Sequence, residues 1–255
     1  FATAFMNVEL TTAHPIAKTA DFLNTQMLRL TGRVLYENST VPSAGVRFLV
    51  NGHPAMTASG IAIESDNLGN VTLTVPKNAP FTLQAEMEGH TFLQAGFVEI
   101  EGSRDLSLSK NLDGVRIWDQ TRTTLIGRIA GGVNQGNLPL GEGKSRNNLG
   151  DDLQMVLELE GDNISHLVYD DKDKNYKTYD TIYQEGSTRT WVRYEQKRII
   201  IRPDSLTGEF CLKLIPANYK LTQATAKGYV ANLTDMNKLV ADVDLNATTH
   251  NISFV

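Results

Sequence analysis

Alternating oxygen-bearing residues in the stretch DDKDKN are compatible with a cation site. Asp171, Asp173 and Asn175 stand two residues apart, as do the first three oxygen ligands of a calcium-binding loop. A complete EF-hand loop has glycine at its sixth position and glutamate at its twelfth, where this chain has tyrosine and isoleucine. The two lysines between the ligands add positive charge. A solvated acidic turn is therefore the favoured interpretation, and a metal site at these three residues is the alternative.

Other motifs that could support catalysis are incomplete. The stretch GEGKS at Gly141–Ser145 ends like a phosphate-binding loop, but Leu138 stands where that motif needs its first glycine. None of the five histidines has a second histidine or a cysteine at metal-ligand spacing. No G-x-S-x-G motif is present, and Cys211, the single cysteine, has no histidine near it in sequence. The sequence therefore predicts no enzyme activity, no catalytic residues and no cofactor.

An aromatic stretch, YKTYDTIYQEGSTRTWVRYE, is the remaining candidate for binding. Two alternating segments flank Glu185-Gly186, a pattern typical of a β-hairpin. We expect Tyr183 to pair with Thr188 in this hairpin, and Asp180 with Trp191. One face is then aromatic and apolar, whereas the other is mixed around Trp191.

Trp191 is the residue of this hairpin most suited to contact a ligand. Period-two geometry puts Arg189 and Arg193 on the same outer face, because unpaired charges rarely enter a core. A large ring held beside guanidinium groups offers a stacking platform for a sugar or a peptide. The competing interpretation is that Tyr179 and Tyr183, on the opposite face, cover a core and that the hairpin is ordinary structure.

Bulk properties indicate a globular protein with packed cores. The 255 residues are 41% hydrophobic and 21% charged. A net charge of −5 without a basic cluster argues against nucleic acid as a partner. No apolar run approaches the roughly 18 residues of a membrane-spanning helix, so we expect no membrane insertion within this segment. The start FATAFMNVEL lacks the features of a signal peptide, and we expect the chain to be part of a longer one.

The strongest pattern in the chain is an internal repeat. The stretch SDNLGNVTLTVPKNAPFTLQAEMEGH contains the turn Asp66–Gly69, then alternates apolar and polar residues, and breaks at Pro76. The stretch PDSLTGEFCLKLIPANYKLTQATAKGY repeats this order with the turn Asp204–Gly208 and the break at Pro216. Period-two alternation between glycine and proline predicts half-buried antiparallel strands, and each copy is expected to form a β-hairpin.

A strand with the pattern L-x-G-R precedes each copy, as LTGRV with Arg33 and as LIGRI with Arg128. The ordered set of this strand, a P-x-x-G-V strand, a D-x-x-G turn, a V-P corner and a final G-[YH] resembles the carboxypeptidase regulatory-domain-like and Cna-B-type family of transthyretin-like β-sandwiches. The first copy matches over 28–110 and the second, more loosely, over 123–229. Some Cna-B-type domains form a Lys–Asn isopeptide bond, but the two arginines stand where the strand lysine would be, so none is expected here.

The resemblance implies an all-β fold of two tandem, Greek-key, transthyretin-like β-sandwiches with about seven strands each. The predicted ranges are an N-terminal extension or tail of a preceding domain at 1–27, a first sandwich at 28–117, a linker at 118–124, and a second sandwich at 125–255 with inserts at about 131–150 and 162–198. The linker is expected because IWDQTRTT carries polar residues between two alternating patterns. In the second copy, alternation places Phe210 and Leu212 in the core and Cys211 on the opposite face.

The resemblance also implies a function. It implies a non-enzymatic structural spacer or interaction module of a larger bacterial cell-surface or secreted protein, with an extracytoplasmic location. The implied partners are neighbouring domains of the same longer chain, and a glycan or a surface protein. The alternative function is carbohydrate or peptide binding through the inserts of the second sandwich, around Trp191.

Overall fold

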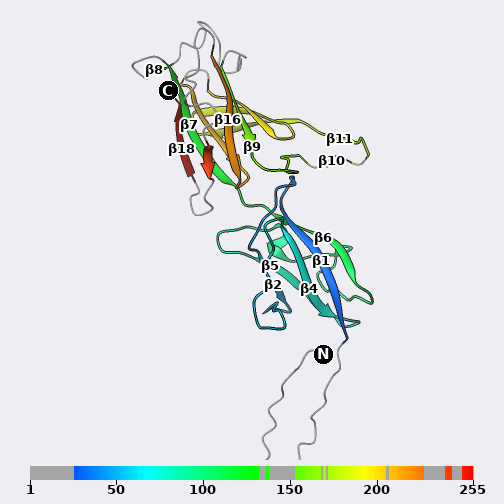
Figure 1. The fold of residues 1–255 in the computed structure, drawn as a ribbon. Coiled ribbons are helices and arrows are strands. Elements are labelled where there is room, and N and C mark those ends of the chain that lie inside the picture. Colours follow the sequence, from blue (N-terminus) through cyan, green and yellow to red (C-terminus); the bar gives the residue numbers. More distant parts are fainter. Residues whose placement is uncertain are drawn as a thin grey trace, which may run out of the picture. The chain divides into compact units, whose positions relative to one another are not determined.

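The computed structural model describes residues 26–131, 136–137, 153–167, 169–170, 172–204, 207–226, 239–242 and 249–254. The regular elements among these residues are β-strands, joined by turns and loops, apart from a short 3-10 helix, η1 (Leu93–Gly96). Figure 1 shows these strands. The prediction of an all-β fold is therefore confirmed. No helix in these ranges is long and apolar enough to cross a membrane.

Tertiary contacts divide the chain into two compact units. Of the described residues, unit 1 holds 26–34, 44–87 and 93–117, and unit 2 holds 35–43, 88–92 and those from 118 onward. The polypeptide therefore leaves unit 1 three times to contribute to unit 2. The domain boundaries given above stay a prediction.

Unit 1 contains two three-stranded sheets. One has the order β4 (Asn70–Pro76), β1 (Met27–Tyr36), β6 (Leu112–Asp119), and the other the order β3 (His53–Pro54), β2 (Arg47–Val50), β5 (Leu83–Glu86). Alternation of side chains along β4 explains its burial, because Val71, Leu73 and Val75 are buried while Thr72 and Thr74 are exposed. Leu30, Phe48 and Leu83 from the other strands are also fully buried.

Unit 2 contains a larger sheet. Its six strands have the order β12 (Tyr179–Glu185), β13 (Thr188–Tyr194), β14 (Arg198–Arg202), β9 (Leu153–Leu159), β16 (Asn218–Ala226), β17 (Leu239–Asp242). A second sheet has β15 (Glu209–Leu214), β7 (Thr123–Gly131) and β18 (Thr249–Phe254), with β8 (Gly136–Asn137) also paired to β7. The short strands β10 (Tyr169–Asp170) and β11 (Asn175–Tyr176) pair with each other.

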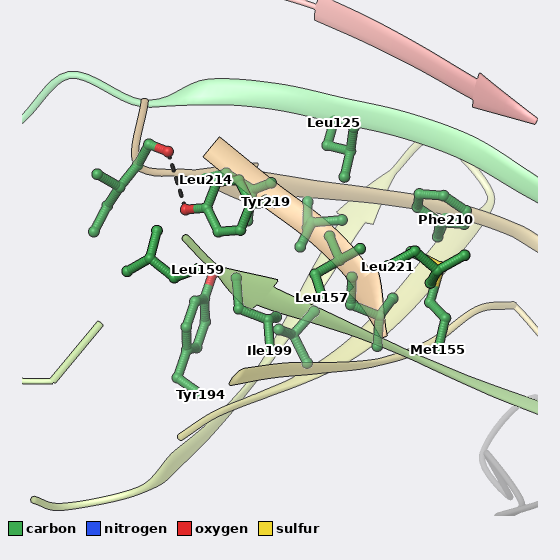
Figure 2. Close-up of a cluster of buried hydrophobic side chains, with 14 of the residues drawn as sticks. Leu125, Met155, Leu157, Leu159, Tyr194, Ile199, Phe210, Leu214, Tyr219 and Leu221 are labelled. Carbon is green, nitrogen blue, oxygen red and sulfur yellow. Dashed lines mark hydrogen bonds between the residues drawn. The ribbon is translucent and has the colours of Figure 1, made fainter. Parts of the chain in front are cut away.

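Apolar side chains from both of these sheets meet in the core of unit 2, which makes this unit a sandwich (Figure 2). Strands β9, β13, β14 and β16 contribute from the larger sheet, and β7 and β15 from the smaller one. Tyr219 is fully buried, and its hydroxyl donates a hydrogen bond to the carbonyl oxygen of Ile215 at 3.0 Å. The bond satisfies the one polar atom of that side chain inside an apolar core.

The two repeated stretches do not form the β-hairpins that their alternation predicted. β4 pairs with β1, whereas β5 pairs with β2 in the other sheet of unit 1. In the same way β15 pairs with β7, and β16 pairs with β9. The corners at Pro76 and Pro216 therefore carry the chain from one sheet to another. Alternation indicates which residues form a strand, but it does not specify the neighbouring strand.

β12 and β13 form the expected hairpin in a different register. Glu185 pairs with Thr188 across the two-residue turn Gly186–Ser187. The expected pairing of Tyr183 with Thr188 is wrong by two residues, because a tight turn replaces the longer loop. Gly186 has a φ of 56°, which such tight turns require and glycine adopts without strain. A shift of two residues leaves every side chain on its expected face.

The expected register of β15 agrees with the core of unit 2. Phe210, Leu212 and Leu214 belong to the apolar cluster, and Cys211 does not. Cys211 is nevertheless only 7% exposed. Its backbone N–H donates to Thr190 Oγ1 of β13 at 2.8 Å, so the hairpin covers this side of β15.

Candidate functional site

Trp191 lies on β13 with its ring in contact with two guanidinium groups. The ring centroid is 4.2 Å from the Cζ atom of Arg202, which stands opposite Trp191 on β14, and 5.3 Å from that of Arg193. Cation–π contacts of this kind contribute about 0.5–1 kcal/mol at exposed sites. Trp191 is half-buried and lies outside the apolar core cluster. Its expected position on the face opposite the core is therefore correct.

A carboxylate on the neighbouring strand holds Arg193. Its Nε and Nη2 atoms donate to Oδ1 and Oδ2 of Asp180 at 2.8 and 3.2 Å. The hydrogen bonds from Arg193 keep the pKa of Asp180 below its usual value. Asp180 was expected opposite Trp191, but Ile182 takes that place and is 50% exposed.

Arg189 shares this face and is half-buried. The structure adds Arg202 to the three residues that the sequence singled out, because β14 pairs directly with β13. The register between two strands separated by a loop cannot be read from alternation alone. A role of Arg189, Trp191 and Arg193 in binding a ligand stays a prediction.

Two of the three residues proposed as metal ligands lie in the described part of the chain. Asp173 Oδ2 forms an ion pair with Lys177 Nζ at 2.8 Å, and Asn175 Oδ1 accepts a hydrogen bond from the N–H of Tyr176 at 2.8 Å. Asp171 lies outside the described residues. Within the described ranges, no group of three or more histidine, cysteine, aspartate or glutamate side chains is placed to hold a metal ion.

Three chain segments meet around Asp119, whose side chain is fully buried in unit 2. The Nδ1 atom of His90 donates to Asp119 Oδ2 at 2.5 Å, and the hydroxyl of Ser43 donates to the same oxygen at 2.8 Å. The backbone N–H of Thr121 donates to Oδ1 at 2.9 Å. Together they satisfy a charge whose burial would otherwise be strongly unfavourable. Ser43, His90, Asp119 and Thr121 are called the Asp119 cluster below.

Backbone hydrogen bonds join the same three segments. The N–H of Glu37 donates to the carbonyl oxygen of Asp119 at 2.8 Å, and the N–H of Gln120 donates to that of Thr91 at 2.7 Å. The N–H of Thr91 in turn donates to Thr121 Oγ1 at 2.9 Å. Each of the three segments that enter unit 2 from unit 1 is thus hydrogen-bonded to another of the three.

The Asp119 cluster contains the residue types of a hydrolase triad without its connectivity. In a triad the serine hydroxyl bonds to the histidine that takes its proton, whereas Ser43 and His90 both donate to Asp119. The side chain of His90 is 1% exposed and stacks with the rings of Tyr36 and Phe92 at 6.3 and 6.1 Å. A substrate could reach these atoms only if the packing around them opened. The arrangement is suited to stabilising the fold.

Hydrogen bonding keeps the aspartate of this cluster charged. Burial alone raises the pKa of Asp119, but hydrogen bonds from His90 and Thr121 outweigh it and hold the pKa below the usual 3.8. A carboxyl with a lowered folded-state pKa stabilises the protein at neutral pH. That contribution is lost only as the pH falls from about 4 through the folded-state pKa.

Reasoning from the sequence missed the Asp119 cluster. His90 was judged by its spacing to other histidines, and Asp119 fell in the expected linker at 118–124. In the structure β6 continues to Asp119, and β7 begins at Thr123 in a different sheet. The one available signal was the residue type, since Asp often accepts a hydrogen bond from the backbone N–H two residues later in an Asx turn, as Asp119 does from Thr121. The partners of the turn come from distant segments and carry no sequence signal.

A second buried histidine lies in the core of unit 2. His166 is 2% exposed, stacks parallel to the ring of Tyr219 at 5.6 Å and meets Tyr194 edge-on at 5.7 Å. Neither ring nitrogen has a hydrogen-bond partner in the part of the chain that is described. Burial, together with the positive charge of Arg122, lowers the pKa of His166 to about 3. The ring is therefore neutral near pH 7 and acts as a packing group.

Comparisons with known proteins give matches only among solved structures. Neither the protein-family models nor the curated protein sequences contain a match to the chain. The chain is similar to the Bacillus anthracis TIE protein at 13% identity with a TM-score of 0.33. It is also similar to a Streptococcal ancillary pilin at 11% identity with a TM-score of 0.28, and to a minor pilin of Streptococcus agalactiae at 11% identity with a TM-score of 0.26.

These alignments cover most of this chain. They include 90, 91 and 89% of it, and 34, 64 and 94% of the TIE protein, the ancillary pilin and the minor pilin. The chain thus spans about a third of the TIE protein chain and less than two thirds of the ancillary pilin chain. TM-scores below 0.5 do not establish a common overall fold.

Proposed function

We propose that this chain is a non-enzymatic structural module of a larger protein that is secreted or displayed at a cell surface. The Asp119 cluster is the observation that carries this proposal. It uses buried serine, histidine and aspartate side chains to bond three separate segments into one unit. The extracytoplasmic location, and neighbouring domains of the same longer chain as partners, come from the resemblance to Cna-B-type and carboxypeptidase regulatory domains.

In this proposal the two units are copies of one transthyretin-like sandwich. Corresponding strands pair alike, since β1 pairs with β4 as β7 does with β15, and β2 pairs with β5 as β9 does with β16. Corresponding arginines also hold corresponding turns. Arg33 Nε donates to the carbonyl oxygen of Leu68 at 2.8 Å, and Arg128 Nε donates to that of Thr207 at 3.2 Å. These matched contacts support a tandem repeat.

The energetic role of the Asp119 cluster follows from its burial. A buried carboxylate depends on hydrogen bonds to compensate its charge, so removal of a donor such as His90 is expected to cost about 1–3 kcal/mol or more. We therefore expect substitution of Asp119 or His90 to weaken unit 2 strongly. In this proposal the residues of the cluster matter because they stabilise unit 2, and they need no substrate to do so.

Labelling with a fluorophosphonate probe tests whether Ser43 is a nucleophile. The native chain is expected to remain unlabelled, because the hydroxyl of Ser43 is buried and bonded to Asp119. Ser43→Ala is expected to lower the free energy of unfolding by about 1–3 kcal/mol, measured by urea titration. Ser39→Ala is the matched control for labelling, since Ser39 is equally buried and bonds to a backbone carbonyl. Labelling that persists in Ser39→Ala and disappears in Ser43→Ala would overturn the proposal.

Ligand binding through the β12–β13 hairpin is the second candidate function. The observation in its favour is Ile182, which is 50% exposed beside Trp191. Two guanidinium groups already contact the ring of Trp191, so a sugar stacked there would have to share it. A glycan array probed with the wild-type chain and with Trp191→Ala tests the carbohydrate version. Glycan binding that depends on Trp191 would favour it, whereas an absence of binding leaves a protein partner as the better fit.

A further inference from the structure

β12 is the outermost strand of the six-stranded sheet in unit 2. Among the described strands it pairs only with β13. Its seven residues pair without a bulge, and they include no lysine and no proline. Natural proteins usually protect an edge strand with a bulge, a lysine or a proline. β12 instead exposes two large apolar side chains, Tyr179 at 46% and Ile182 at 50%.

The turn of the hairpin fixes which backbone groups face the open edge. The residue pair that flanks a two-residue turn is hydrogen-bonded, so Glu185 directs its N–H and C=O toward β13. Alternation then directs the N–H and C=O groups of Asp180, Ile182 and Gln184 away from β13. These three residues also carry their side chains on the face shared with Trp191, because Ile182 and Trp191 form a cross-strand pair.

We propose that β12 pairs with β12 of a second copy of this chain, antiparallel and with Ile182 opposite Ile182. This register pairs all seven residues of both strands and allows about six backbone hydrogen bonds between the copies. Its two-fold symmetry places the same surface on both sides of the contact. The two Ile182 side chains then cover each other beside the two Trp191 rings.

The charges of β12 agree with this register. It places Asp180 opposite Gln184, Tyr179 opposite Glu185, and Thr181 opposite Tyr183, so no like charges meet. A shift by two residues loses two pairs at the ends of the strands. A shift by four residues in one direction puts Asp180 opposite Asp180, which is unfavourable.

A second copy fits this edge better than an acidic peptide does. Arginines on β13 and β14 give the neighbouring face a positive character, but the edge strand itself carries Asp180 and Glu185. An acidic strand added to β12 would place its carboxylates next to these two. The hydrogen-bonding groups of the edge allow strand pairing, and the charges along it favour self-pairing.

Disulfide cross-linking tests the proposed register directly. Ile182→Cys is made in a Cys211→Ser background and oxidised mildly. Hydrogen-bonded antiparallel pairs have Cα atoms about 5.5 Å apart, a separation that a disulfide spans. Ile182→Cys is expected to form covalent dimers at least about tenfold faster than Gln184→Cys, which faces position 180 in the partner. Ile61→Cys is the matched control, since Ile61 of unit 1 is 66% exposed and lies outside the contact.

Sedimentation velocity between about 10 µM and 1 mM supplies the reversible measurement, over the range in which weak contacts form. The wild-type chain is expected to show a monomer–dimer equilibrium, and Ile182→Lys is expected to remain a monomer because an edge lysine blocks strand pairing. Ile61→Lys should behave like the wild type. Cross-linking of Ile182→Cys that is no faster than that of Ile61→Cys, or association unchanged in Ile182→Lys, would overturn the proposal. Either result would leave a different partner for this edge as the remaining interpretation.

Discussion

Strand β4 of unit 1 and strand β15 of unit 2 have matching positions and different surroundings. Val71 of β4 pairs with Gly32 of β1, and Phe210 of β15 pairs with Gly127 of β7. The next residues along, Thr72 and Cys211, therefore occupy equivalent sites. Thr72 is exposed, whereas Cys211 is 7% exposed. One pattern of alternation thus gives an outer residue that is solvated in one unit, Thr72, and one that is covered in the other, Cys211.

The β12–β13 hairpin accounts for this difference. Thr190 Oγ1 accepts a hydrogen bond from the N–H of Cys211, and the hydroxyl of Tyr194 donates to the carbonyl oxygen of Lys213 at 3.1 Å. Side chains of the hairpin therefore satisfy backbone groups of β15. The comparison shows that a hairpin can protect one edge of a sandwich while it presents a new edge, β12.

Substitution of equivalent core leucines would have the largest effect on this comparison. Leu73 and Leu212 are 1% and 0% exposed. Changing either to alanine is expected to lower the free energy of unfolding of its own unit by about 2–5 kcal/mol. Differential scanning calorimetry is expected to show two unfolding transitions. Leu73→Ala should lower the midpoint temperature of one, and Leu212→Ala that of the other. A single transition that both variants lower equally would mean that the two units do not unfold separately.

Acid should weaken unit 2 through His166. The pKa of His166 is about 3 in the folded chain and 6.5 for an ordinary histidine, so the unfolded state binds a proton between these values and the folded state does not. Stability therefore falls as the pH drops through this window, by about 2–3 kcal/mol between pH 7.5 and pH 4.5. Urea titrations at the two pH values are expected to show this loss in the wild type and a much smaller loss in His166→Phe.

The matched control for this experiment is His53→Phe, because His53 is an exposed residue of unit 1. It should retain the full pH dependence. An equal loss of stability in His166→Phe and in the wild type would show that other groups are responsible.

The smallest of these effects concerns the hydrogen bond that covers β15. Thr190→Val keeps the shape of the side chain but leaves the buried N–H of Cys211 without its acceptor, at a cost of about 1–3 kcal/mol. Thr72→Val, at an exposed position of unit 1, is expected to change stability by less than about 0.5 kcal/mol. Urea titration measures both. Equal effects of the two substitutions would contradict the difference drawn between β4 and β15.

Local patterns in the sequence predicted the strands and their faces. Alternation around Leu73 and Leu212 identified core positions correctly, and it placed Trp191 on the side opposite the core. The same patterns failed wherever the answer depended on the identity of a neighbouring strand. Each repeated stretch was expected to be a hairpin, although Pro76 and Pro216 lead the chain into a different sheet.

The Asp119 cluster was beyond prediction for a related reason. Ser43, His90 and Asp119 are far apart in the chain, and their contact depends on three returns of the polypeptide into unit 2. The register of the β12–β13 hairpin was missed by two residues because turn length decides it. Arg202 joined Trp191 through a strand pairing that no local signal specifies.

A double-mutant cycle between His90 and Asp119 tests most directly whether the cluster holds unit 2 together. The free energies of unfolding of His90→Ala, Asp119→Ala and the double variant are measured by urea titration at pH 7. Because the carboxylate of Asp119 is fully buried and bonded to His90, we expect each single change to be strongly destabilising and the pair to be coupled by at least about 1.5 kcal/mol. Single changes of less than about 0.5 kcal/mol, or losses that add within that amount, would contradict the structural role assigned to the cluster.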